Sequence, residues 1–148
     1  MAATTGCQLV LSDVPIEALQ AAAARARCER LSGRATPVAA SARALPFARA
    51  AFDAVVHTDV LCWLRPKLSV LRACRRILRP AGRTAFLTIH PAAGLTRAQR
   101  RRASRDGPIA VVTARPHREL LESAGFTHIT QTNCTAEFAT TTRAWLQQ

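Results

Sequence analysis

The chain has 148 residues, which is enough for one domain with a single hydrophobic core and too few to suggest two. Hydrophobic residues make up 49% of it, and no apolar run approaches the ~18 residues that a transmembrane helix needs. The net charge is +12, but only one of the 21 basic residues is lysine and alanine is abundant, which is typical of a GC-rich genome and implies no ligand. Composition thus excludes a disordered or membrane-spanning chain, and the N-terminus lacks the features of a secretory signal, so we expect one α/β domain in the cytoplasm.

The first third of the sequence predicts a strand, a helix and a second strand. Residues 8–12 form a short apolar run that suits a strand buried in a parallel sheet, with Asp13 at its carboxyl end. Residues 15–31 carry apolar side chains at helical spacing, with Asp13 placed to cap the helix. Residues 35–40 predict a weaker strand, because Pro37 cannot donate to a sheet ladder.

The middle of the sequence repeats this alternation more strongly. Residues 52–56 predict a strand, and residues 84–89 predict another. Between them, apolar residues recur every three or four positions and predict an amphipathic helix that ends at the turn 80–82. Strands that alternate with helices indicate a parallel sheet with right-handed crossovers.

The last third begins with a basic segment that we expect to be a solvated loop. It holds five arginines between Arg97 and Arg105 and no aromatic residue on which a base could stack. We therefore do not expect nucleic acid as a partner. Residues 116–124 predict a helix, residues 127–132 a strand, and Thr135 the start of a final helix.

The cysteines give no sign of a metal site. They are odd in number, and none is paired at the C-x-x-C spacing of zinc or redox motifs. We expect buried free thiols, no metal and no disulfide framework. The five are Cys7, Cys28, Cys62, Cys74 and Cys134.

Three pieces of sequence carry a resemblance to a known family. They are Ala44-Leu45-Pro46-Phe47, then Phe52-Asp53-Ala54-Val55-Val56 with Asp59-Val60-Leu61, and then residues 71–83 with the turn Leu-Arg-Pro-Ala-Gly. In this order and spacing the pieces resemble the central segment of a small-molecule class I S-adenosylmethionine-dependent methyltransferase, with Ala81 in place of the first glycine of the turn. The resemblance implies a Rossmann-like parallel sheet over residues 1–148, S-adenosylmethionine as cofactor and a small-molecule methyl acceptor.

The resemblance also implies a set of cofactor-binding residues. Asp13 stands where the family places the acid that accepts hydrogen bonds from the ribose hydroxyls, and its other reading is a plain helix cap. Val14 would lie against the adenine face. Ser41 replaces the family's acid at the adenine edge, where the Ala42 amide could also serve.

His57 follows the fourth strand of the family pattern, where the pocket holds the methionine part of the cofactor. It is the best-placed titratable side chain, although the sequence favours a structural histidine over a catalytic one. Methyl transfer can proceed by alignment and exclusion of water, so the family implies no particular base and we name no catalytic residue. His90 is a second, weaker candidate. The arginines between Arg97 and Arg118 lie where the family varies to cover its substrate.

Two parts of the family pattern are absent from the sequence. The first strand and its Gly-x-Gly-x-Gly loop would precede Asp13, and Gly6 is the only glycine before Gly33. The final strand is missing as well, so we expect an incomplete sheet with unpaired edges. Three hypotheses remain open: a start codon placed too late, a truncated paralogue without activity, or a basic non-enzymatic protein that binds nucleic acid or anions on the same scaffold.

Overall fold

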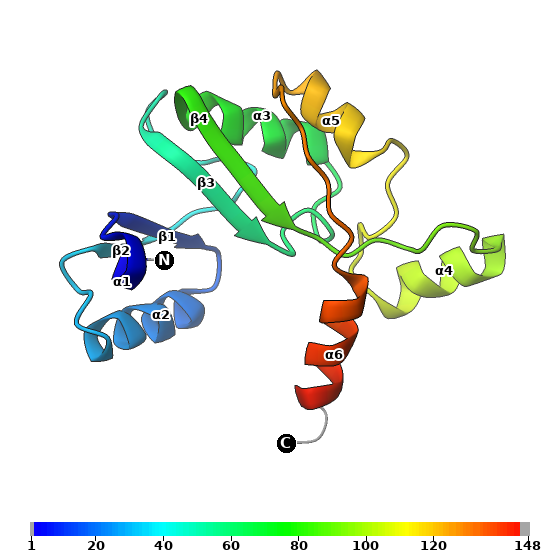
Figure 1. Cartoon of the computed structure of the whole chain (residues 1–148), viewed down its shortest axis with the longest axis horizontal. Helices are drawn as coiled ribbons and strands as arrows, with labels where there is room; N and C mark the ends of the chain where they lie inside the picture. Colours follow the sequence, from blue (N-terminus) through cyan, green and yellow to red (C-terminus); the bar gives the residue numbers. More distant parts are fainter. Residues whose placement is uncertain (1, 146–148) are drawn as a thin grey trace.

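The structure is a computed structural model that describes residues 2–145. Four strands and three helices make up the first part of the described chain, with β2 followed directly by β3, and helices alone follow β4 (Figure 1). No described helix combines the length and the apolar character that crossing a bilayer requires. The elements are α1 (Ala2–Thr5), β1 (Leu9–Asp13), α2 (Ile16–Cys28), β2 (Ala35–Ala39), β3 (Phe52–Thr58), α3 (Lys67–Ile77), β4 (Leu78–Leu87), α4 (Arg97–Asp106), α5 (His117–Ser123) and α6 (Thr135–Trp145).

The N-terminal half is a β–α–β unit. β1 and β2 pair in parallel, from Leu9 opposite Ala35 to Asp13 opposite Ala39, and α2 packs against both strands. Pro37 is tolerated because β2 has a partner on one side only, so its missing N–H can face the unbonded edge. The expected weak strand is thus confirmed as an edge strand.

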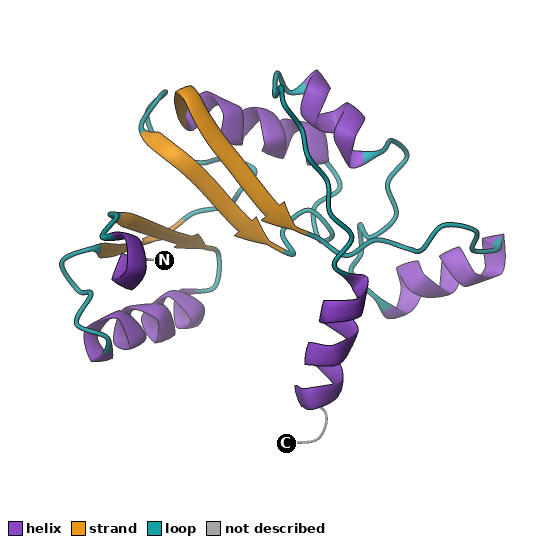
Figure 2. Cartoon of the chain, viewed as in Figure 1, coloured by secondary structure: helices purple, strands orange, loops and turns teal. Residues whose placement is uncertain are grey.

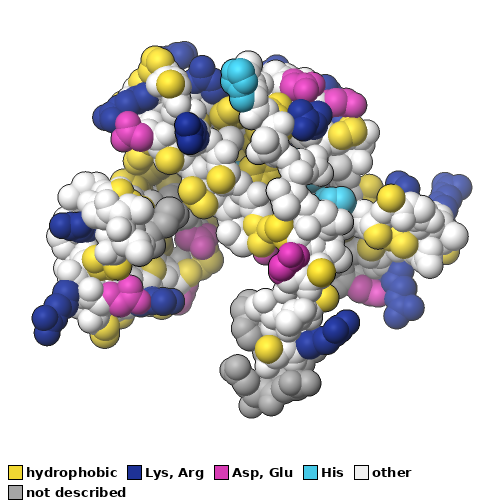
Figure 3. Space-filling model, in the orientation of Figure 1, with side chains coloured by type: hydrophobic (Ala, Val, Ile, Leu, Met, Phe, Trp, Pro, Cys, Tyr) yellow, Lys and Arg dark blue, Asp and Glu magenta, His cyan; other side chains and the backbone are white. Residues whose placement is uncertain are grey.

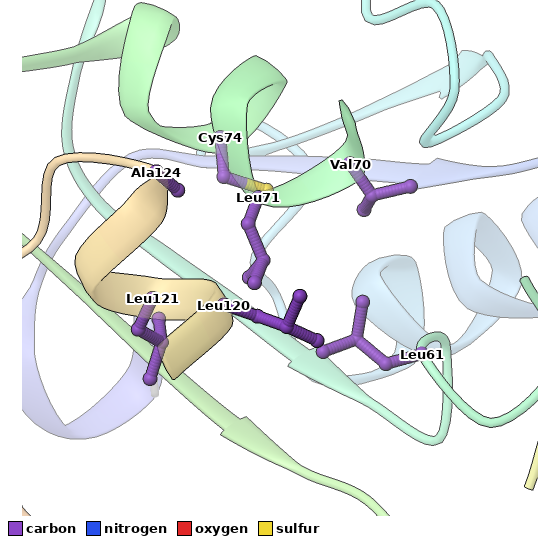
Figure 4. Packing of buried hydrophobic residues seen from close by; sticks show 7 residues of the cluster. All are labelled: Leu61, Val70, Leu71, Cys74, Leu120, Leu121 and Ala124. Atoms are coloured by element: carbon purple, nitrogen blue, oxygen red, sulfur yellow. The ribbon is translucent and has the colours of Figure 1, made fainter. Parts of the chain in front are cut away.

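The C-terminal half contains a second β–α–β unit with a fuller core. β3 and β4 pair in parallel from Ala54 opposite Arg83 to Thr58 opposite Leu87, and α3 and α5 pack against one another. Leu71 of α3 and Leu120 of α5 point into the same cluster (Figure 4). This cluster explains the predicted apolar stripe of α3. Its members are Leu61, Val70, Leu71, Cys74, Leu120, Leu121 and Ala124.

The two strand pairs do not join into one sheet. Within residues 2–145, β1 bonds only to β2 and β3 bonds only to β4 (Figure 2). The expectation of unpaired edges is confirmed. Two valines beside these edges show the consequence, because Val10 is 38% exposed and Val56 is 53% exposed.

Three local expectations were wrong. Residues 127–132 form no strand, and no described strand bonds to them. The basic segment is the helix α4 and not a loop, because Thr96 and Gln99 form a capping box that starts a helix with no buried residue. Asp13 does not cap α2, whose N-cap is Pro15.

The turn at residues 80–82 lies inside β4 as a register irregularity between the two strands. Ala81 adopts a left-handed conformation with φ 61°, which is unfavourable for a residue with a Cβ atom. Gly82 is required, because a Cβ atom there would come within 2.9 Å of the Arg79 carbonyl oxygen. The helix α3 thus ends at Ile77, before the predicted turn, and the backbone strain of the turn falls on Ala81, the residue that replaces the first glycine of the family pattern.

Candidate functional site

A cavity of about 770 Å³ lies between the two strand pairs. Residues of β1 line one wall and residues of β3 line the other. The carboxyl ends of both strands belong to its lining, and this is the edge where α/β sheets bind ligands. The candidate site therefore lies between the end of β1, at Asp13, and the end of β3, at His57.

Asp13 ends β1 with part of its carboxylate unused. One oxygen accepts the Val14 N–H at 2.7 Å, and the Asp13 carbonyl accepts the Ala40 N–H at 3.0 Å. The second carboxylate oxygen has no hydrogen-bond partner among residues 2–145. Val14 beside it is 64% exposed. This geometry leaves an acceptor and an apolar side chain open at the cavity.

Ser41 and Ala42 follow β2 and line the same cavity. The Ser41 hydroxyl accepts the Arg43 N–H at 3.2 Å, so it keeps its own hydrogen to donate. Ala42 packs against the buried cluster of the C-terminal half, which fixes this loop between the two units. Its backbone N–H has no partner in the described chain and can donate to a ligand.

His57 belongs to the lining too, but its ring lies in a packed environment. It stacks on Phe86, its neighbour on β4, with ring centroids 4.9 Å apart and planes 4° from parallel. Both ring nitrogens are buried without a hydrogen-bond partner among the described residues. Burial lowers the pKa of His57 to about 4, so the ring is neutral at pH 7.

Two residues of the site received no role from sequence. Asp59 follows β3, mirrors Asp13 at the other wall, and has φ 54°, a strained conformation for a residue with a side chain. Its N–H donates to the Leu87 carbonyl at 2.9 Å, which ties it to β4. Trp63 lines the cavity as well and is 53% exposed. An acid placed directly after a parallel strand was the signal that could have identified Asp59.

The cavity carries no basic residue although the chain is strongly basic. No lysine or arginine lines it, while Asp13, Asp53 and Asp59 do. On the face seen in Figure 3, the basic side chains (dark blue) lie mainly toward the outer parts of the molecule. The site therefore favours a neutral or cationic ligand with an apolar part. No group of three or more His, Cys, Asp or Glu able to hold a metal occurs in residues 2–145.

Solved structures share this fold. The phosphoethanolamine N-methyltransferase 2 of Haemonchus contortus, in complex with S-adenosyl-L-methionine, superposes with a TM-score of 0.78 and 21% identity over 93% of this chain and 32% of that chain. The cyclase SpnF gives 0.70 and 26% over 84% and 44%. A geranyl diphosphate methyltransferase in complex with its cofactor gives 0.67 and 16% over 84% and 49%. The chain thus spans less than half the length of these proteins.

The family follows from the sequence comparison rather than from these distant structures. No curated protein matches the chain. Residues 1–86, more than half of its length, match the family model of a methyltransferase domain. The α/β architecture with parallel strands agrees with that match and with the resemblance carried by residues 44–83. The chain therefore belongs to the methyltransferase domain family and has the Rossmann-like fold of the class I S-adenosylmethionine-dependent enzymes.

Proposed function

We propose that the cavity between β1 and β3 is one side of an S-adenosylmethionine site in a methyltransferase that acts on a small molecule. The observation that carries the proposal is the free carboxylate oxygen of Asp13 at the carboxyl end of β1. A carboxylate there can accept hydrogen bonds from two neighbouring hydroxyls of a ribose. SpnF shares the fold and is named a cyclase, so the proposal depends on the site and not on the fold.

The other residues of the cavity complete the proposed recognition. Val14 offers an apolar side chain to the adenine face, and the Ala42 N–H can donate to the adenine edge. Ser41 stands where a second adenine contact is expected, with a hydroxyl hydrogen still available. Asp59 adds negative charge near the methionine end, and the absence of lysine and arginine from the lining suits a sulfonium cation.

The cofactor supplies an electrophilic methyl group, and the chain's residues orient it and keep water away. His57 is neutral at pH 7 and buried against Phe86, so in this proposal it shapes the wall rather than removes a proton. In this proposal the methyl acceptor is a small molecule, as it is for the relatives named phosphoethanolamine N-methyltransferase and geranyl diphosphate methyltransferase. A single cytoplasmic domain over residues 1–148 remains part of the proposal.

The open edges of β1 and β3 predict weak binding. Residues 2–145 provide no strand between them, so the cofactor contacts only two of the walls that surround a buried ligand. We expect S-adenosylhomocysteine to bind with a dissociation constant of about 1 mM, because the contacts of two walls offset less of the entropy cost of association than those of a closed site would. The same argument favours a chain that transfers methyl groups poorly on its own.

Chemical-shift mapping by NMR with S-adenosylhomocysteine tests this proposal. We expect perturbed amide signals for Asp13, Val14, Ser41 and Ala42, and a loss of these perturbations in Asp13→Asn. Asp53→Asn is the matched control, because Asp53 lines the opposite end of the cavity and is paired with Arg79 at 2.6 Å. Perturbations confined to other residues, or equal effects of the two substitutions, would refute the proposed site.

A further inference from the structure

The helix α4 stands out from the rest of the molecule. None of its residues is buried, and it projects from the body after the loop that follows β4 (Figure 1). Ala98 and Ala103 are its only apolar residues. A helix of ten residues without an apolar face gains little from packing, so its surface is available for another role.

The charge of α4 is concentrated and only partly neutralised. Of its five arginines, Arg102 and Arg105 share the single acid Asp106, at 3.3 and 2.7 Å. The other three, Arg97, Arg100 and Arg101, form no ion pair within residues 2–145. Three unneutralised guanidinium groups thus lie within five consecutive positions.

These arginines occupy an unfavourable end of the helix. They lie in its first half, where the helix dipole is positive and where α4 has no acidic residue in its first turn. The helix is stabilised there instead by its capping box, in which Thr96 Oγ1 accepts the Gln99 N–H at 3.3 Å and Gln99 Oε1 accepts the Thr96 N–H at 2.9 Å. The capping box therefore supports a helix, while the arginines place positive charge where the helix dipole repels it. An anionic partner would relieve this repulsion.

We propose that α4 binds the phosphate backbone of nucleic acid without sequence preference. Two of the unneutralised arginines, Arg97 and Arg101, are four residues apart, so they are separated by about 6 Å along one side of the helix, a spacing that suits successive phosphates. The absence of aromatic residues from α4 removes base stacking as a source of selectivity. The absence of any large apolar side chain argues against insertion into a membrane surface. Composition alone did not favour this partner, whereas the placement of the charges on an unpacked helix does.

Fluorescence anisotropy with a fluorescein-labelled 20-nucleotide oligo(dT) tests the proposal on the whole chain. The triple variant R97Q/R100Q/R101Q removes the unneutralised charges. The matched control R27Q/R34Q/R83Q removes the same charge from exposed arginines that form no ion pair in the described chain. Circular dichroism verifies that both variants keep the fold of the parent chain.

We expect salt-dependent binding by the parent chain and at least about tenfold weaker binding by the α4 variant at 100 mM NaCl. The slope of log affinity against log salt should fall by about 2, since each lost phosphate contact lowers it by ~0.7 on a single strand. The control variant should keep most of the affinity and of the slope. Equal losses in the two variants, no binding at 50 mM NaCl, or binding only to vesicles that contain phosphatidylserine would each overturn the proposal.

Discussion

The two β–α–β units of this chain have the same topology and differ in what covers them. In the N-terminal unit and α1, only Ala2, Leu19 and Ala26 are buried hydrophobic residues. In the C-terminal unit, α3 and α5 together bury a contiguous cluster around Leu71 against one face of β3 and β4. A strand, a crossover helix and a parallel strand are therefore not enough for a core, and a second helix over the sheet decides which half is well packed.

The difference also bears on the walls of the candidate site. One wall of the cavity is β3, which belongs to the well-packed C-terminal unit. The other wall carries Asp13 and Val14 and belongs to the N-terminal unit, which has few buried side chains. A ligand in the cavity would bridge two units that share no strand pairing. Binding should thus stabilise the N-terminal unit more than the C-terminal one, because a ligand that binds the folded form shifts its equilibrium.

Truncation of the two cores gives the largest expected difference. Leu71→Ala should destabilise the chain by about 3 kcal/mol, since it leaves a cavity in the buried cluster of the C-terminal half. Leu19→Ala, in the unit with few buried side chains, should cost about 2 kcal/mol and act locally. Urea unfolding measures the first effect, and hydrogen exchange shows whether the second is confined to β1 and β2. Equal global losses would mean that the two units share one core.

Acid should destabilise the C-terminal unit through His57. Its pKa is about 4 in the folded chain and about 6.5 in the unfolded chain, so the unfolded state binds the proton first as pH falls. Stability should therefore decrease between pH 6.5 and pH 4, by up to about 3 kcal/mol. The neighbouring His117 adds in the same direction, because burial and the charge of His90 lower its pKa.

His57→Phe isolates this contribution. A phenyl ring keeps the stack on Phe86 and has no charge to gain, so the variant should lose most of the pH dependence between pH 6.5 and pH 4. Thermal unfolding at several pH values gives the measurement. A variant whose pH dependence matches that of the parent chain would assign the acid sensitivity to other groups.

Lys67 should show how firmly the loop after α4 is attached to the packed unit. Its ammonium group is buried and donates to the carbonyls of Leu61, Leu64 and Ala110, the last of which lies in that loop. Lys67→Met would leave these carbonyls without a donor and should cost about 2 kcal/mol. Lys67→Arg is the control that keeps the charge. Faster hydrogen exchange near Ala110 in the methionine variant alone is the expected observation.

The smallest expected effect is a gain. Ala81 has φ 61°, so Ala81→Gly should relieve strain and stabilise the chain by about 0.5 to 1 kcal/mol. Gly33→Ala, at a glycine with negative φ and open space, should change stability little and serves as the comparison. A loss of stability in Ala81→Gly would show that the backbone of this turn is not strained.

Much of the fold was predictable because local pattern and packing agree. The strands at Leu9, Phe52 and Thr84 and the helix around Leu71 have apolar spacing that only a buried sheet and a half-buried helix explain. Residues 127–132 have the same local pattern and form no strand, because pairing depends on a distant free edge that sequence does not reveal. The helix α4 was missed because it has no large apolar side chain, although Thr96 and Gln99 carried the capping signal.

The candidate site was predictable to the extent that its residues lie at strand ends. Asp13, Val14, Ser41, Ala42 and His57 all line one cavity, and their role in binding a cofactor stays a prediction. It could not foresee that the His57 ring stacks on Phe86, because that contact depends on the register of β3 against β4. It also assigned no role to Asp59, whose position opposite Asp13 becomes evident only when the two strands face the same cavity.

Isothermal titration calorimetry of the chain with S-adenosylmethionine tests most directly whether the proposed cofactor site is open between β1 and β3. Because β1 and β3 have no strand between them in the described chain, we predict very weak binding or no measurable heat at micromolar concentrations. A micromolar dissociation constant would contradict the account, since it would require a closed site that residues 2–145 do not form.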